Sequence, residues 1–381
     1  MTVIKRRKVI MIVESFFSER DVARYGSYFF IENDVDFEVL DLSPLLRPHY
    51  FNELKDRTIR HEFHKLIFSK EQFFKEIASS CENASVICKM STGQENSFIF
   101  RCLEDNKIPY GFAYLGEIPM ISNIKFSRWP LFVVKLKKII KKVLKIKSSL
   151  SPNFVIVSGS ESVKKTENEF FGRELDYIYS HCLDFDNFLA VKDNAIKEEL
   201  PFAVFIDEDQ PFHEDYNFLG IDPPCEPDIY YSEVNRFFDN YEKSFGIKVV
   251  IAGHPRANYR DRNPYGSREI IQGMTHTLIQ QCIQVIGHAS TSFSYAVLFS
   301  KPITLLNSDN YHSRLSNSVS SFAKELKIKD INLTRESRLS SLPEVNKEGY
   351  ENYKRKYIKL KDCDDSSKTS TQIFIDYLVE T

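Results

Sequence analysis

Residues 202–209 read FAVFIDED, an apolar run that ends in three acidic residues. Two later segments follow the same pattern: residues 249–256 read VVIAGHPR, and residues 285–292 read VIGHASTS. Short apolar runs of this kind are typical of buried strands in a parallel sheet. Ligands of open parallel sheets bind beyond the carboxyl ends of the strands. We therefore expect the acids, the imidazole and the hydroxyls that end these runs to meet at one site.

Similar apolar runs alternate with longer polar and amphipathic stretches along the whole chain. They occupy residues 9–13, 37–40, 84–88, 110–114 and 154–157 in the first half and 202–206, 248–252, 283–287 and 302–306 in the second. This alternation indicates βαβ units and parallel sheets. Between residues 228 and 245 apolar residues recur at helical spacing and Gly246 follows, which predicts a helix with a glycine C-cap.

A polar, charged segment at residues 191–200 separates the two blocks. The sequence therefore predicts an α/β protein with two Rossmann-like domains facing a cleft. We assign residues 1–190 to an N-terminal domain on the acceptor side and residues 200–360 to a C-terminal donor domain. Residues 361–381 are expected to form a C-terminal helix that packs back on the N-terminal domain.

The composition excludes several classes of protein. With 381 residues and 42 % hydrophobic content, the chain can build two cores, and its net charge of −2 gives no general attraction to nucleic acid. No apolar run approaches the length that spans a bilayer. The seven cysteines include no C-x-x-C pair, which favours reduced thiols in a cytoplasmic protein over a zinc site.

A basic amphipathic helix is predicted near residues 130–147. Residues 135–147 carry seven lysines and no acid, and their apolar residues recur at three- and four-residue spacing. This pattern is typical of binding to an anionic membrane surface, so we expect a cytoplasmic protein that is peripheral on the inner membrane face. The alternative is a helix docked on the sheet with a solvated lysine face.

The acidic segment Asp207-Glu208-Asp209 is a candidate general base. Repulsion between close carboxylates raises at least one pKa, which suits a base that works near neutral pH. The alternatives are a D-x-D metal site for a nucleotide diphosphate and a solvated acidic loop. A second D-x-D pattern, Asp184-Phe185-Asp186, is interpreted as a loop near the domain boundary.

The other two segments are candidate phosphate ligands. Pro255 biases His254 towards extended geometry, from which the imidazole could donate to a phosphate oxygen, and Arg256 adds a permanent charge. Ser290, Thr291 and Ser292 precede a predicted helix at residues 293–299, where hydroxyls and free N–H groups favour an anion. The turn at residues 158–162, SGSES, could also hold a phosphate, but it is interpreted as a βα turn with an N-cap.

In this order, the three segments resemble motifs of the bacterial sialyltransferases of the GT-B fold and their relatives that transfer other nonulosonic acids or Kdo. Those families have an Asp/Glu-Asp/Glu-Gly motif, a His-Pro motif and a Ser-Ser/Thr motif. The matching residues are Asp207-Glu208, His254-Pro255 and Ser290-Thr291-Ser292, and the resemblance covers residues 200–306. The glycine of the first motif is Asp209 here, so either Asp207 or Glu208 could be the base.

The resemblance implies an inverting glycosyltransferase that needs neither metal nor cofactor. It would move an acidic sugar from a CMP-activated donor to a surface glycan of capsule or lipopolysaccharide type, free or lipid-linked. Asp207 would be the base ahead of Glu208, and His254 would contact the donor phosphate beside Pro255 and Arg256. Ser290, Thr291 and Ser292 would stabilise that phosphate as it leaves.

Two other interpretations stay open. One is a GT-B transferase with a UDP-, GDP- or CDP-linked donor, including polyol-phosphate transferases; sugar-nucleotide epimerases share the same two-domain fold. The other is a non-catalytic, membrane-docked component of a polysaccharide assembly complex, in which Asp207 would be dispensable.

Overall fold

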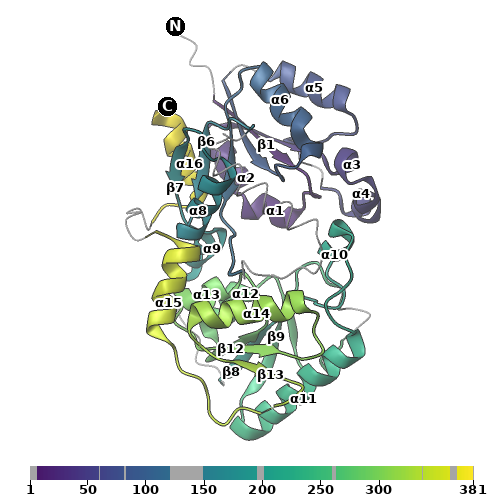
Figure 1. Ribbon diagram of the computed structural model, residues 1–381, viewed down its shortest axis with the longest axis vertical. Coiled ribbons are helices and arrows are strands. Elements are labelled where there is room, and N and C mark those ends of the chain that lie inside the picture. The colour runs from purple at the N-terminus through teal and green to yellow at the C-terminus, as the bar shows by residue number, and fades with distance from the viewer. Residues whose placement is uncertain are drawn as a thin grey trace. The chain divides into compact units, whose positions relative to one another are not determined.

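The computed structural model (Figure 1) consists of two compact units, each described here by itself. It describes residues 7–59, 61–80, 83–120, 149–194, 201–259, 263–336, 338–360 and 367–380. The basic helix predicted near residues 130–147 lies outside these residues. Of the described residues, the first unit contains 7–115, 149–183 and 367–380, and the second contains 116–120 and 184–360.

A seven-stranded parallel sheet with the order β3-β2-β1-β4-β5-β6-β7 forms the centre of the first unit. Its strands are β1 (Lys8–Val13), β2 (Asp36–Asp41), β3 (His64–Leu66), β4 (Ala84–Lys89), β5 (Tyr110–Tyr114), β6 (Phe154–Val157) and β7 (Asp176–Tyr179). β1 pairs with both β2 and β4. The strand order therefore reverses between β1 and β4, which makes this point the topological switch point of the sheet.

Helices cover both faces of the first sheet, so alternate residues of each inner strand enter different cores. Ile10 and Ile12 pack with α5 and α6, whereas Val9 and Met11 pack with α1, α2 and α16. The helices of this unit are α1 (Glu19–Arg24), α2 (Ser27–Glu32), α3 (Ser43–Leu46), α4 (Pro48–Leu54), η1 (Lys55–Arg57), α5 (Lys70–Ser79), η2 (Gln94–Asn96), α6 (Ser97–Asp105), α8 (Ser160–Glu169) and α16 (Ser370–Glu380).

The C-terminal helix α16 is part of the first unit (Figure 1). Its Phe374 is 1 % exposed, and the ring lies 5.3 Å from that of Phe154 on β6 and 6.3 Å from that of Phe30 on α2. The last helix of the chain thus completes a core that the first strand begins.

A six-stranded parallel sheet with the order β10-β9-β8-β11-β12-β13 forms the second unit. Its strands are β8 (Phe202–Ile206), β9 (Lys248–Gly253), β10 (Ile270–Gln272), β11 (Gln284–Gly287), β12 (Ile303–Asn307) and β13 (Asp330–Asn332). β8 pairs with β9 and with β11, so the switch point lies between β8 and β11. Each apolar run predicted as a strand forms one.

The helices of the second unit are α9 (Leu183–Val191), which begins one residue before it, α10 (Asp215–Leu219), α11 (Pro227–Phe245), α12 (Thr275–Gln281), α13 (Phe293–Leu298), α14 (Ser313–Leu326), α15 (Lys347–Tyr353) and the π-helix η3 (Lys354–Ile358). The helix predicted at residues 228–245 is confirmed as α11. It ends at Gly246, whose φ of +67° lies in the left-handed region that glycine adopts readily.

Helix α9 corrects two expectations. Asp184 and Asp186 lie in its first turn, not in a loop. The second unit also begins at Asp184, before the boundary predicted at residues 191–200. The reason is packing: the ring of Phe188 lies 5.0 Å from that of Phe299, and Asn187 donates to the Tyr295 hydroxyl at 2.8 Å. Within the described residues, no helix has both the length and the apolar character needed to cross a bilayer.

Candidate functional site

The three segments singled out in the sequence lie at neighbouring strand ends of the second sheet. Asp207 and Glu208 follow β8, His254 follows β9, and Ser290 lies just beyond the end of β11. Because β8 lies between β9 and β11, the acids occupy the middle of this group. The structure therefore brings all three together at the carboxyl edge of the sheet.

Asp207 is buried and holds its own loop together. Its side chain is almost inaccessible, with the residue 2 % exposed. Oδ1 accepts the N–H of Asp209 at 2.7 Å, and Oδ2 accepts the hydroxyl of Tyr259 at 2.5 Å. Burial raises the pKa of Asp207 to about 6. Both carboxylate oxygens are thus engaged in contacts that shape the site.

Tyr259 connects the acidic segment to the His-Pro segment, and the sequence analysis did not identify it. Its hydroxyl donates to Asp207 and accepts the backbone N–H of His254 at 2.9 Å. Gly253 makes room for the ring, because a Cβ at that position would lie 2.8 Å from Cε2 of Tyr259. Nothing in the spacing of the chain indicates this contact, which exists only once the loop folds back.

The side chain of Glu208 reaches from the end of β8 across the switch point to the segment that follows β11. Its Oε2 accepts the side-chain amide of Gln210 at 2.9 Å and the backbone N–H of Ala289 at 3.3 Å. No described residue donates to Oε1. Burial raises the pKa of Glu208 to about 7. Glu208 as a whole residue is half-buried, whereas Asp207 is buried.

His254 lines a pocket of about 390 Å³ that Asp209, Phe212, Glu214, Arg256, Ala257 and Asn258 complete. The ring of His213 lies 4.7 Å from that of His254, and burial lowers the pKa of His213. Arg256 is already paired: its Nη1 lies 3.6 Å from Glu214 and its Nη2 lies 3.3 Å from Asp215. Pro255 is exposed. Of the phosphate ligands predicted in this segment, His254 therefore remains the candidate, because it lines the pocket and Arg256 is already paired.

The hydroxyl segment forms the tight turn that opens α13. The N–H groups of Phe293, Ser294 and Tyr295 bond to the carbonyls three residues earlier at 3.3, 3.0 and 3.0 Å. The Ser290 hydroxyl accepts the N–H of Ser292 at 3.2 Å. Among the described residues, none forms a hydrogen bond with the hydroxyls of Thr291 and Ser292.

The turn at residues 158–162 of the first unit shows the opposite case. Ser162 Oγ donates to the carbonyl of Gly159 at 2.6 Å and accepts the N–H of Ser158 at 3.0 Å. Ser158 Oγ donates to the carbonyl of Tyr114 at 3.3 Å. The hydroxyls of Ser158 and Ser162 are therefore engaged within the protein, although helix α8 begins after Gly159 without the side-chain cap that the sequence analysis expected. The contrast leaves Thr291 and Ser292 with hydrogen-bonding capacity for a ligand.

Asp209 has a backbone conformation that glycine adopts readily. Its φ is +48°, in the left-handed region, and the residue is 5 % exposed. Aspartate is one of the few other residues that tolerate this region, because its short side chain can bond locally. An aspartate in place of the glycine expected from the motif is therefore compatible with this backbone conformation.

His288 plays a structural part beside the site. Its Nδ1 donates to the carbonyl of Leu306 at 2.8 Å, and its Nε2 accepts the hydroxyl of Tyr230 at 3.1 Å. Burial lowers the pKa of this histidine to about 4, so the ring is neutral at physiological pH.

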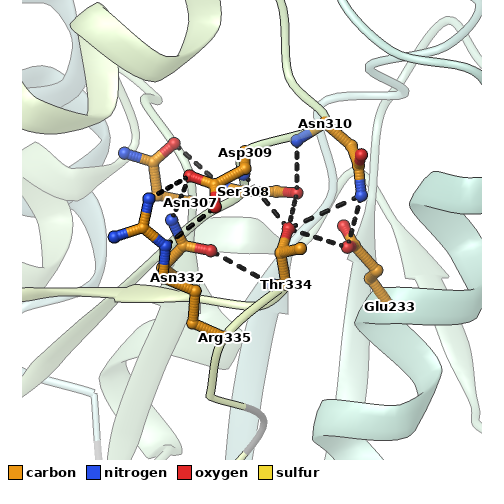
Figure 2. A network of polar contacts seen from close by, with 8 residues as sticks. All are labelled: Glu233, Asn307, Ser308, Asp309, Asn310, Asn332, Thr334 and Arg335. Atoms are coloured by element: carbon orange, nitrogen blue, oxygen red, sulfur yellow. Dashed lines mark hydrogen bonds and ion pairs between the residues drawn. The ribbon is translucent and has the colours of Figure 1, made fainter.

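A polar network, also unforeseen from the sequence, holds the loops after β12 and β13 against α11 (Figure 2). Glu233 on α11 accepts the side-chain amide of Asn310 at 2.8 Å and the hydroxyl of Thr334 at 3.1 Å. Asp309 accepts from Asn332 at 2.8 Å and pairs with Arg335. The network fixes the end of β12, whose Leu306 carbonyl holds His288. In the part of the chain that the structure describes, no group of three or more His, Cys, Asp and Glu side chains could hold a metal ion.

Comparisons with known proteins identify the fold. No family model and no curated protein matches the chain. Among solved structures, the wall teichoic acid polymerase TagF with CDPG is similar, at 10 % identity over 98 % of this chain and 88 % of TagF, with a TM-score of 0.53. The S. aureus MnaA–UDP structure is similar at 13 % identity over 98 % of this chain and 97 % of MnaA, with a TM-score of 0.50. Together with the two parallel sheets, these likenesses establish the GT-B fold.

Proposed function

We propose that this chain is a GT-B transferase that uses a donor linked to a nucleoside diphosphate of the CDP or UDP class. One observation carries the proposal: the switch point of the second sheet joins Glu208, an acid with a pKa near 7, to a turn with two unused hydroxyls. A base and an anion site side by side are what group transfer from a phosphate-linked donor needs.

In this proposal the hydroxyls of Thr291 and Ser292, beyond the end of β11, bind the donor phosphate. His254, which follows β9, also donates a hydrogen bond to it. Hydrogen bonds of this kind stabilise the negative charge that grows on the phosphate as the nucleotide leaves. Arg256 contributes less to phosphate binding than its charge suggests, because Glu214 and Asp215 already neutralise it.

Glu208, rather than Asp207, is the base in this proposal. The Glu208 carboxylate accepts the proton of the attacking acceptor hydroxyl. At the same time the hydroxyl oxygen bonds to the transferred group, and the bond between that group and the nucleotide phosphate breaks. Oε1 of Glu208 receives no hydrogen bond from the described residues, whereas both oxygens of Asp207 are occupied. Asp207 then acts as the residue that holds the loop.

The proposed donor class follows the ligands that two structures of the same fold contain. MnaA was solved with UDP and TagF with CDPG. They support a nucleoside diphosphate donor ahead of the CMP-linked acidic sugar that the motif order suggests. The proposal therefore adopts the alternative from the sequence analysis of a GT-B transferase with a UDP-, GDP- or CDP-linked donor.

Thermal denaturation with CMP, CDP, UDP and GDP tests the donor. A nucleotide at 100 times its dissociation constant should stabilise the chain by about 2.7 kcal/mol. We expect CDP or UDP to raise the midpoint and CMP to have less effect. A response to CMP alone would return the acidic-sugar donor, and no response to any of the four would reject the transferase.

Nucleotide release from a CDP- or UDP-linked donor tests the base. Glu208→Gln should lower kcat by roughly 10²- to 10⁴-fold, while Glu269→Gln, an exposed control on the other edge of the sheet, should not. In the unaltered chain the rate should rise with pH through about 7 as Glu208 loses its proton, and Glu208→Gln should lose this rise. Equal rates for Glu208→Gln and the unaltered chain would contradict the assignment.

The same assay tests the absence of a metal. The proposed ligands of the phosphate are two hydroxyls and an imidazole, so we expect the rate to survive EDTA. Loss of activity with EDTA and its recovery with Mg²⁺ would favour the D-x-D metal site.

A further inference from the structure

We propose that Tyr28, His61 and Glu19 form a second reactive site, in which the Tyr28 hydroxyl attacks the activated acyl group of an ester or a thioester. The site lies in the first unit and shares no residue with the site proposed for the donor. The inference therefore does not depend on the proposed function.

The three side chains come from separate elements of the first unit. Glu19 is the first residue of α1, Tyr28 is the second residue of α2, and His61 precedes β3. Nε2 of His61 lies 3.0 and 3.1 Å from the two carboxylate oxygens of Glu19, and Nδ1 lies 3.1 Å from the Tyr28 hydroxyl. The contacts join residues that are 42 and 33 positions apart, so the fold and not the local sequence creates them.

Glu19 determines which nitrogen of His61 carries the proton. An ionised carboxylate only accepts hydrogen bonds, so Nε2 of His61 donates to Glu19. In the neutral imidazole the lone pair is then on Nδ1, which accepts the O–H of Tyr28. A carboxylate that orients an imidazole, and an imidazole that accepts the proton of a hydroxyl, together activate that hydroxyl as a nucleophile.

Phe63 holds the imidazole in place. Its ring stacks on that of His61, with the centroids 4.9 Å apart and an angle of 5° between the planes, and Tyr28 meets both rings edge-on at 5.8 Å. Phe63 packs against a core of the first unit, and its carbonyl accepts the N–H of Val39 on β2 at 2.7 Å. Because the core fixes the ring beneath the base, His61 and Tyr28 are pre-organised for proton transfer.

Exposure leaves the hydroxyl accessible to a substrate. Tyr28 is 50 % exposed, whereas the side chain of His61 is 20 % exposed. The side chain of Glu19 is 69 % exposed, and an ion pair so open to water contributes little to the stability of the fold. The main consequence of these contacts is therefore their effect on the reactivity of Tyr28.

The reaction transfers the acyl group to the phenolic oxygen. That oxygen attacks the carbonyl carbon while its proton passes to Nδ1 of His61, and Glu19 stabilises the imidazolium that forms. The bond from the carbonyl carbon to the leaving oxygen or sulfur then breaks, and the leaving group takes the proton from His61. The product is an aryl ester on Tyr28, which remains a reactive acyl donor because the pKa of a tyrosine hydroxyl is only about 10.

Acetylation of the full chain by p-nitrophenyl acetate, mapped by peptide mass spectrometry, tests the site. A general base accelerates such a step by about 10²- to 10⁴-fold, so we expect Tyr28 to be acetylated at least tenfold faster than Tyr179. Tyr179 is the matched control: it lies in the same unit and is 49 % exposed, but its ring stacks on that of Tyr177 at 6.0 Å. His61→Gln should lower the Tyr28 rate to that of Tyr179.

Glu19→Gln is the second variant. Glu19 is exposed, so the fold should stay intact, and the loss of its charge should slow the acetylation of Tyr28 several-fold while the rate at Tyr179 stays the same. Equal rates at Tyr28 and Tyr179 in the unaltered chain would overturn the inference. It would also fail if either His61→Gln or Glu19→Gln left the ratio of the Tyr28 rate to the Tyr179 rate unchanged.

Discussion

The hydroxyl of Tyr259 is the point where the acidic and His-Pro segments meet. It donates to a buried carboxylate and accepts a backbone N–H, so one oxygen sets the positions of Asp207 and His254. Asp207 cannot turn to water instead, because it is 2 % exposed. A residue with no part in the chemistry thus decides whether the predicted site residues are in place.

We expect Tyr259→Phe to destabilise the fold by about 1–3 kcal/mol, since it leaves a buried acceptor and a donor unsatisfied. The loss should be greater at pH 8 than at pH 5. The pKa of Asp207 is raised from 3.8 to about 6, so its protonation stabilises the folded chain at low pH and this contribution falls as the pH rises through 6. Without the tyrosine, the ionised form is less stable still.

Thermal midpoints at the two pH values measure this effect. Tyr311→Phe is the control, because the Tyr311 hydroxyl is also buried but has no hydrogen-bond partner among the described residues. It should shift the midpoint little and equally at both pH values. Identical behaviour of the two variants would show that the Asp207 contact contributes nothing.

Asp209 offers a second test at the scale of one residue. Because its φ is +48°, Asp209→Gly should be neutral or stabilising, whereas Asp209→Val should cost about 1–2 kcal/mol through its Cβ and branched side chain. Chemical denaturation of the two variants compares them directly. A glycine variant that is less stable than the valine variant would mean that the Asp209 carboxylate matters more than the backbone.

At the scale of elements, the sequence analysis found the inner strands and missed the edges. The four strands it did not predict are β3, β7, β10 and β13, and each is an edge of its sheet. An inner strand is buried on both faces and reads as a continuous apolar run. An edge strand is short and half-exposed: β3 reads HKL and β13 reads DIN. Its pairing depends on the neighbour, which composition does not record.

The contact between α14 and α15 provides a prediction for an element. Gly349 on α15 lies against the backbone of Leu326, the last residue of α14, and a Cβ there would overlap the Leu326 carbonyl. Gly349→Ala should therefore destabilise the chain by about 3 kcal/mol, although alanine favours helix.

Gly116→Ala serves as its control. No atom of the described residues lies within 4 Å of a Cβ at Gly116, so the substitution should change the stability little. Urea denaturation of the two variants gives the comparison, and equal midpoints would mean that the two helices separate easily to admit the methyl group.

At the scale of the whole molecule, the chain leaves the first unit and returns to it. Residues 184–360 build most of the second unit, and α16 then supplies Phe374, Ile375 and Leu378 to a core of the first. The end of the chain is therefore needed for the stability of the part that begins it.

Phe374→Ala should lower the stability of the first unit by about 3–5 kcal/mol, because the ring is fully buried. The stabilisation by CDP or UDP should persist, since the proposed nucleotide site lies wholly in the second unit. Calorimetry with and without nucleotide measures both effects. Val379→Ala, on the same helix at 66 % exposure, is the control. If CDP and UDP no longer stabilise Phe374→Ala but still stabilise Val379→Ala, the nucleotide site does not lie wholly in the second unit.

The sequence by itself determined the inner strands, helix α11 and the three polar segments that follow β8, β9 and β11. These features are local: apolar runs, helical spacing and the residues directly after a strand express them without reference to the rest of the chain. Parallel strands end at the same edge, so the meeting of these segments also follows from the sequence.

Only the tertiary structure decided which side chains of those segments are available. Asp207 ranked first in the sequence, but contacts with Tyr259 and the Asp209 N–H occupy it, while Glu208 reaches the next strand end with one oxygen to spare. The edge strands, the place of α9 and the contacts among Glu19, Tyr28 and His61 were decided in the same way. Hydrogen bonds and burial depend on residues far apart in the chain, and these residues come into contact only when the sheets form.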